Sequence, residues 1–186
     1  MQINIILFIS GGGSNARQII AYFKGNERIQ IVGVLSSKPN HAMEAFCSDH
    51  GVAFQNFQDQ GFTSYLTFCK NNNVHWIVLA GFLKKIPLEF IVAYPNHIIN
   101  IHPALLPGFG GAGMYGKFVH QAVFNSKAKF SGITIHLVNE EYDKGQLLYQ
   151  HAVALSEEES PESIEQKVRS LELKHFAEDL ESYIVK

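Results

Sequence analysis

The chain has 186 residues, of which 46% are hydrophobic, and this length suits one domain with a sizeable buried core. Its formal net charge of −2 at pH 7 excludes a broad basic surface for nucleic acid or for an anionic membrane. Any phosphate must therefore be bound by a local site. The two cysteines, Cys47 and Cys69, form no CxxC pair, so we expect neither a disulfide nor a zinc site.

The N-terminal apolar run, residues 3–9, is followed at once by Ser10 and three glycines. It has no basic segment before it, and it is too short for a signal peptide or a membrane span. We therefore expect a cytoplasmic protein without a membrane segment. A continuous apolar run of this length is typical of a central strand that is buried on both faces.

Short apolar runs alternate with amphipathic stretches through the first half of the chain. The runs predict strands and the stretches predict helices. Repeated β-α units of this length predict an α/β fold with a doubly wound, mostly parallel sheet and helices on both faces. The expected strands are residues 3–9, 29–35, 52–54, 76–80 and 98–101, and the expected helices are residues 15–24, 42–50, 62–70 and 87–94.

The pattern changes after Pro103. A glycine-rich loop, residues 108–117, leads to a short helix over residues 119–124 and then to two strands, residues 132–138 and 146–154. The chain ends in a long helix over residues 161–184, for which Ser160 is a suitable N-cap and Pro161 a suitable first residue. There is no linker or repeat, so residues 1–186 are expected to form a single domain.

The segment Ser10–Asn15, with sequence SGGGSN, joins the first strand to the first helix. Its glycines allow a ligand to approach the backbone, and the N–H groups at a helix start attract an anion. A plain tight turn is the alternative. A dinucleotide would need an acidic residue after the second strand, where Ser36, Ser37 and Lys38 stand instead, and there is no P-loop motif. A small phosphate ester is the favoured ligand.

Asn100 and His102 are the most informative pair in the sequence. Residues two apart on a strand point to the same face, and the carboxyl end of a parallel strand is where ligands bind in such sheets. The pair offers an amide donor for a developing oxyanion and an imidazole for proton transfer. The alternative is a structural Asn and His at a strand end.

The turn after residue 138 holds three carboxylates in four positions, Glu140, Glu141 and Asp143. They are either solvated surface or the source of one carboxylate that orients His102, and spacing does not choose among them. His136 shares a strand face with Thr134 and is interpreted as a hydrogen-bonded packing residue. The segment of residues 79–86 places an apolar rim beside Lys84 and Lys85, which suits a flat ligand with acidic ends.

With these residues in hand, the chain resembles the phosphoribosylglycinamide formyltransferases, a family of formyltetrahydrofolate-dependent transferases. The resemblance runs nearly from end to end. The motifs that carry it are SGGGSN at Ser10–Asn15, LAGF at residues 79–82, NIHP at residues 100–103 with ALLP at residues 104–107, GITIH at residues 132–136, and DKG at residues 143–145.

The resemblance implies a role for individual residues. Asn100, His102 and Asp143 match the catalytic trio of the family. The expected substrate-binding residues are Gly11, Gly12, Gly13, Ser14 and Asn15 of the phosphate loop, with Glu172 of the last helix. The expected folate-binding residues are Leu79, Leu83, Lys84, Lys85, Ile86, Asn139, Glu140, Glu141 and Tyr142.

The resemblance also implies transfer of a formyl group from 10-formyltetrahydrofolate, as co-substrate, to the amine of glycinamide ribonucleotide in purine synthesis. No metal is expected, and the protein is expected to be a monomer or a weak homodimer. The rival activities are formylation of another amine and hydrolysis of formyltetrahydrofolate. A non-catalytic phosphate-binding module is the alternative from another class, and it gives no use to the pair Asn100 and His102.

Overall fold

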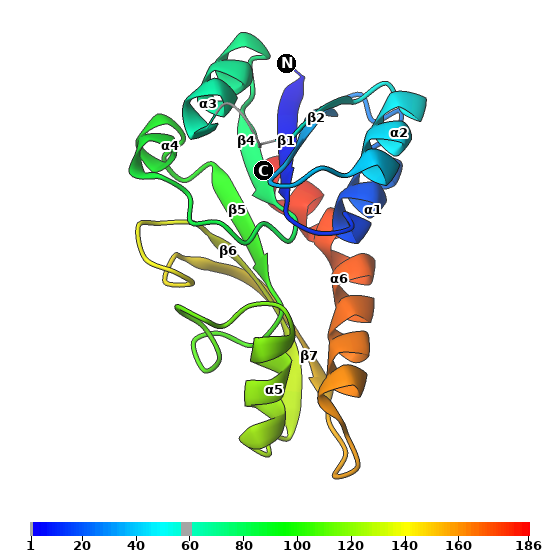
Figure 1. Ribbon diagram of the computed structural model, residues 1–186, viewed down its shortest axis with the longest axis vertical. Helices are drawn as coiled ribbons and strands as arrows, with labels where there is room; N and C mark the ends of the chain where they lie inside the picture. Colours follow the sequence, from blue (N-terminus) through cyan, green and yellow to red (C-terminus); the bar gives the residue numbers. More distant parts are fainter. Residues whose placement is uncertain (1, 57–60) are drawn as a thin grey trace. The chain divides into compact units, whose positions relative to one another are not determined.

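The computed structural model describes residues 2–56 and 61–186, and over these residues seven strands form one sheet (Figure 1). The strand order is β3-β2-β1-β4-β5-β6-β7. This architecture confirms the predicted α/β fold with a mostly parallel, doubly wound sheet. The strands are β1 (Ile3–Ile9), β2 (Ile29–Ser36), β3 (Ala53–Asn56), β4 (Trp76–Leu79), β5 (Ile98–His102), β6 (Phe130–Leu137) and β7 (Leu147–Ala154).

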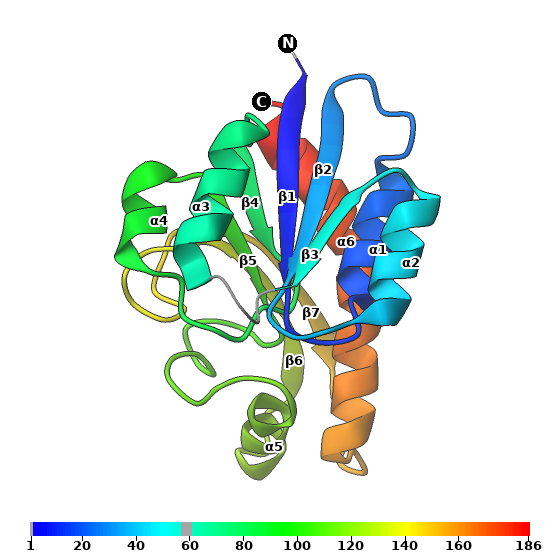
Figure 2. The same cartoon turned by 45° about the horizontal axis from the view of Figure 1, so that its top comes forward.

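The chain divides into two compact units, one ending at Ile99 and one running from Asn100 to Ile184. In the first unit, β1 pairs in parallel with β2 and β4, and β2 pairs in parallel with β3. Figure 2 shows α1 and α2 on one face of these strands and α3 and α4 on the other. Right-handed crossovers require this arrangement when the strand order reverses at β1. The helices are α1 (Ser14–Tyr22), α2 (His41–Asp49), α3 (Gly61–Asn71) and α4 (Leu88–Ala93).

Phe8 of β1 is the centre of the first unit's aromatic core. Its side chain is fully buried, and its ring lies 6.2 Å from Tyr65 of α3, 5.4 Å from Phe82 and 5.9 Å from Phe90 of α4 between ring centroids. All three contacts are edge-to-face, the arrangement that aromatic quadrupoles favour. These contacts fix α3, α4 and the segment after β4 against one face of β1.

The second unit contains β6 and β7, which are antiparallel, and the helices α5 (Lys117–Asn125) and α6 (Pro161–Ile184). Ser160 caps α6 as predicted, because its Oγ accepts the Ser163 amide at 3.2 Å. A Cβ on Gly145 would overlap the Leu137 carbonyl oxygen, so only glycine fits the close approach between the two strands.

The predicted element boundaries agree with the structure to within two residues, including the whole of α6. The start of β6 is one of the larger differences. It begins at Phe130, two residues before the predicted start, because Phe130 pairs with Ala154 across the antiparallel ladder. Within the part of the chain that the structure describes, no helix is both long and apolar enough to span a bilayer.

Removing the Phe8 ring should destabilise the protein strongly. We expect Phe8→Ala to lower the free energy of unfolding by about 3–5 kcal/mol, since the truncation leaves a cavity among three rings. Phe130→Ala is the matched control, because that ring is 57% exposed and its loss should cost about 1 kcal/mol or less. Denaturant unfolding of both variants measures the difference, and equal losses would contradict the central role of Phe8.

Candidate active site

The loop after β1 is built around the left-handed conformation of Gly13. Gly13 is the N-cap of α1 with φ of 76°, and a Cβ there would lie 2.8 Å from the Met43 sulfur. Glycine is therefore required both by the backbone angle and by the packing of α2 against the loop. The first amide groups of any α-helix have no partner in the helix ladder, so the start of α1 at Ser14 is a position that favours an anion.

Asn40 holds this loop from the start of α2. Its Nδ2 donates to the Gly11 carbonyl at 3.0 Å, while its Oδ1 accepts the Met43 amide at 3.0 Å and caps the helix. Gly11 and Gly12 themselves are exposed, and Asn15 is buried. None of the motifs in the sequence analysis includes Asn40, although Asn before a helix is the usual signal of an N-cap.

His102 and Asp143 lie together in the second unit. His102 Nδ1 is 3.6 Å from Asp143 Oδ2, and both side chains are largely buried. The backbone of residues 109–111 fixes the pair, since His102 Nε2–H donates to the Phe109 carbonyl at 2.7 Å and the Gly111 amide donates to Asp143 Oδ2 at 2.8 Å. Of the three carboxylates in the turn, Asp143 is the one that the structure brings to His102.

His136 joins Asn100 to this pair. Its Nδ1–H donates to the Leu137 carbonyl at 2.8 Å, so its Nε2 accepts the Asn100 amide at 3.0 Å. The same Nε2 lies 3.6 Å from Asp143 Oδ1. His136 is buried and hydrogen-bonded as predicted, but its partners are the candidate catalytic residues. Its place in the GITIH motif of the resemblance was the signal that the sequence offered.

Burial and charge set the ionisation of the pair. Burial lowers the pKa of His102 below its ordinary value, and the Asp143 charge and the Phe109 carbonyl oppose this only in part. For Asp143, burial raises the pKa, but the contact with His136, the charge of His102 and the Gly111 amide outweigh it, and the net pKa is lowered. A neutral imidazole beside a carboxylate is therefore the form present at neutral pH.

This arrangement defines where a proton can enter. Nε2 of His102 already carries the hydrogen that binds Phe109, so the free lone pair of the neutral ring is on Nδ1, facing Asp143. A proton taken up at Nδ1 would be stabilised by the nearby carboxylate. The pair can thus act as a base, His102, whose protonated form is stabilised by the Asp143 carboxylate, and the Asn100 amide is a donor in the same group of side chains.

Gly110 is the position where the loop packs most closely on Asp143. A Cβ on Gly110 would overlap the Leu106 side chain and would lie 3.1 Å from the Asp143 Cβ. The start of the glycine-rich loop, residues 108–117, therefore has a defined role in the structure. It supplies backbone groups to His102 and Asp143 at a distance that any larger residue would prevent.

The expected folate-binding residues fall into buried and exposed classes. Leu79 and Ile86 are each 5% exposed and pack in the core of the first unit, while Leu83, Lys84 and Lys85 are exposed. In the second unit, Asn139 Oδ1 accepts the Glu141 amide at 3.0 Å and shapes an exposed turn that also carries Glu140 and Tyr142. Glu172 lies half-buried on α6.

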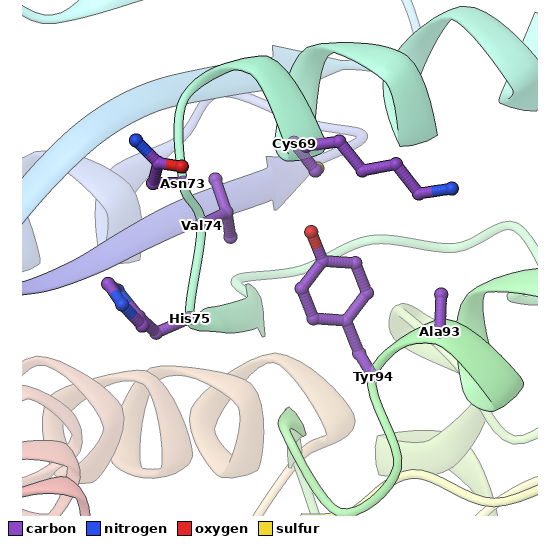
Figure 3. A pocket seen from close by; sticks show the side chains of 7 residues that line it. Cys69, Asn73, Val74, His75, Ala93 and Tyr94 are labelled. Carbon is purple, nitrogen blue, oxygen red and sulfur yellow. The ribbon is translucent and has the colours of Figure 1, made fainter.

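A pocket of about 400 Å³ lies in the first unit beside the residues that precede β4 (Figure 3). Tyr94 points its hydroxyl toward Cys69, with which it shares a hydrogen bond, and burial raises the pKa of that thiol to about 12. None of the expected site residues belongs to this pocket. Its lining residues are Cys69, Lys70, Asn73, Val74, His75, Ala93 and Tyr94.

Comparison with known proteins gives the family. The model of the formyl transferase family matches residues 3–180. The chain belongs to this family. It is 31% identical over 182 residues to the phosphoribosylglycinamide formyltransferase of Bacillus subtilis, covering 91% of this chain and 89% of that protein.

The plant relatives are longer. The chain is 38% identical over 183 residues to the chloroplastic phosphoribosylglycinamide formyltransferase of Arabidopsis thaliana, covering 94% of this chain and 63% of that protein. The corresponding protein of Vigna unguiculata is 36% identical, with 60% of its length covered. The chain thus spans somewhat less than two thirds of the plant relatives that it matches.

Solved structures show the same architecture. The phosphoribosylglycinamide formyltransferase of Brucella melitensis superposes with a TM-score of 0.87 at 29% identity, covering 100% of this chain and 97% of that one. A formyltetrahydrofolate deformylase of Pseudomonas syringae superposes with a TM-score of 0.86 at 21% identity, covering 97% of this chain and 60% of that one. The second likeness shows the fold alone, so the fold does not distinguish the two reactions.

Replacing Asp143 by Asn should lower the pKa of His102 further. The carboxylate raises the pKa of His102 in the native protein, and its removal leaves burial unopposed by that charge. Asn tolerates the left-handed backbone found at Asp143, where φ is 55°. An NMR titration of the His102 ring measures the shift, and Glu140→Gln on the same turn is the control. A His102 pKa that rises or stays constant in Asp143→Asn would contradict the coupling.

Proposed function

We propose that this chain transfers a formyl group from 10-formyltetrahydrofolate to the primary amine of glycinamide ribonucleotide, in de novo purine synthesis. The observation that carries the proposal is the buried pair His102 and Asp143, joined to Asn100 through His136. Relatives named phosphoribosylglycinamide formyltransferase support it. We further propose that residues 1–186 act as one formyltransferase domain, which is supported by a single family match over residues 3–180.

The phosphate of the acceptor binds, in this proposal, to the loop Gly11–Asn15. The exposed glycines and the amides at the start of α1 support this role, because they offer N–H donors and a favourable helix dipole to an anion. The net charge of the protein is negative, so the affinity for phosphate must come from this local geometry. Glu172 is proposed to contact the rest of the acceptor.

The folate is proposed to contact apolar and charged residues of two segments. Leu83, which is 51% exposed, offers an apolar surface to a flat ring, and the neighbouring lysines offer charge to its acidic tail. The proposed folate-binding residues are Leu79, Leu83, Lys84, Lys85, Ile86, Asn139, Glu140, Glu141 and Tyr142.

The proposed chemistry is direct attack of the neutral amine on the formyl carbon. Asn100 donates a hydrogen bond to the formyl oxygen as it becomes negative in the tetrahedral intermediate. His102 accepts the proton that the amine loses, and Asp143 stabilises the resulting imidazolium. Collapse of the intermediate breaks the bond to the folate nitrogen, which receives the proton. The scheme uses no covalent enzyme intermediate and no metal. We also propose that the protein is cytoplasmic and is a monomer or a weak homodimer.

Hydrolysis of formyltetrahydrofolate is the second candidate activity. It is a candidate because the fold, which is shared with the deformylase of Pseudomonas syringae, does not distinguish the two reactions. In that reaction, water would take the place of the amine. The phosphate loop argues for the transferase, since a hydrolase has no phosphorylated acceptor to hold.

A single assay separates these activities. The protein is mixed with 10-formyltetrahydrofolate, with and without glycinamide ribonucleotide, and the folate absorbance is followed. We expect a change only when the ribonucleotide is present. The same rate of change without the acceptor would indicate the hydrolase, and no change in either mixture would indicate a binding module.

Truncating the candidate catalytic residues should reduce turnover in a folded protein. We expect His102→Ala to lower kcat by about 10²–10⁴-fold through loss of proton transfer. Asn100→Ala should lower it by about 10²–10³-fold through loss of an oxyanion donor. His41→Ala is the control, because that histidine is exposed on α2. Native activity in His102→Ala would refute the assigned role.

Changing the phosphate loop should affect binding more than turnover. In Ser14→Ala, we expect KM for glycinamide ribonucleotide to rise by about tenfold, the loss of roughly one hydrogen bond to a charged group, with kcat nearly unchanged. Ser64→Ala serves as the control, because Ser64 is a half-buried serine of α3 that belongs to neither proposed binding segment. A lowered kcat with an unchanged KM would place Ser14 in the chemical step instead.

A further inference from the structure

Ser10 connects the two ligand-binding segments of the first unit. It is the last residue before the phosphate loop, and its backbone N–H donates to the Gly81 carbonyl at 3.0 Å. Its side-chain Oγ accepts the Leu83 amide at 2.9 Å. Two hydrogen bonds therefore tie Ser10 to the segment after β4, on which the expected folate residues Leu83, Lys84 and Lys85 stand.

Ser37 fixes the orientation of the Ser10 hydroxyl. Its Oγ–H donates to the Ser10 Oγ at 2.7 Å, so the two acceptor sites of that oxygen are taken by Ser37 and the Leu83 amide. Ser37 is itself tied to β1, because its N–H donates to the Ile9 carbonyl at 2.9 Å. Ser10 and Ser37 are each 7% exposed, so water has little access to replace these bonds.

We infer that Ser10 is a positioning residue that couples the phosphate loop to the folate segment, so that binding of either substrate strengthens binding of the other. The physical path is short. Gly11 and Gly12 follow Ser10 directly, so an anion that shifts their backbone on binding acts on Ser10, whose oxygen holds the Leu83 amide. Coupling of this kind is reciprocal by thermodynamic necessity. The identities of the two ligands rest on the proposed function, but the path itself does not.

The first experiment tests the path without any enzymatic activity. Inorganic phosphate is titrated into the ¹⁵N-labelled protein, and the amide signals of Gly12 and Leu83 are followed by NMR. We expect both signals to move with the same apparent Kd in the native protein. In Ser10→Ala, the Gly12 signal should still move while the Leu83 response falls by at least about threefold.

A matched control is available in Ser131, a serine of β6 that is 1% exposed and whose hydroxyl makes no hydrogen bond among the described residues. Ser131→Ala removes the same buried atom without breaking the Ser10 network. Its Leu83 response should equal that of the native protein. The inference would be overturned if the Leu83 signal of the native protein did not shift when phosphate is added. It would also be overturned if that signal shifted as much in Ser10→Ala as in the native protein.

The second experiment measures the coupling between substrates. The KM for glycinamide ribonucleotide is determined at low and at saturating 10-formyltetrahydrofolate. In the native protein and in Ser131→Ala, we expect KM at low folate to exceed KM at saturating folate by about fivefold or more. In Ser10→Ala, the two KM values should differ by less than about twofold. The change in kcat caused by Ser10→Ala should be smaller than the change in this KM ratio. Equal ratios in all three proteins would overturn the inference. If the native protein transfers no formyl group, the proposed function fails while the NMR result still decides the role of Ser10.

Discussion

The buried contact between His102 and Asp143 is the interaction on which the candidate site depends. Two ionisable groups removed from water are costly unless each has partners, and here the backbone of residues 109–111 supplies one to each. The Phe109 carbonyl fixes which nitrogen of His102 carries its hydrogen, and the Gly111 amide stabilises the charged form of Asp143. The absence of a side chain at Gly110 allows this loop to approach closely. The site is thus assembled by main-chain groups as much as by side chains.

His136 extends this pair to Asn100 and ties three elements of the sequence together. Because its Nδ1–H is used by a carbonyl, its Nε2 is held as an acceptor, and this orients the Asn100 amide. The same nitrogen lies 3.6 Å from Asp143 Oδ1, so His136 contacts both Asn100 and Asp143. A residue in the interior of β6 is therefore part of the same buried group as the proposed catalytic residues.

The fold provides positions, and the chemistry comes from the side chains placed on them. The same architecture occurs in a phosphoribosylglycinamide formyltransferase and in a formyltetrahydrofolate deformylase, so the sheet does not select the acceptor. The feature that favours a phosphorylated acceptor is the loop Gly11–Asn15, shaped by the left-handed Gly13 and held by Asn40. Ser10 connects that loop to the segment carrying Leu83. In our proposal, the choice of acceptor and the coupling between the substrates therefore depend on a few hydrogen bonds at strand ends.

The sequence by itself determined the α/β sheet, the element boundaries and the shared face of Asn100 and His102, because hydrophobic period and turn residues are local properties. It also indicated an anion loop from its glycines. Spacing left Glu140, Glu141 and Asp143 open, and only the family resemblance pointed to Asp143. The tertiary structure shows that Asp143 is the one that meets His102, and that His136, Asn40 and Ser10 are partners of the proposed site residues. These contacts join residues that are far apart in the sequence: Asn40 and Gly11 are 29 positions apart, and Ser10 and Leu83 are 73 positions apart. Local spacing along the chain does not show which of such distant residues meet in space.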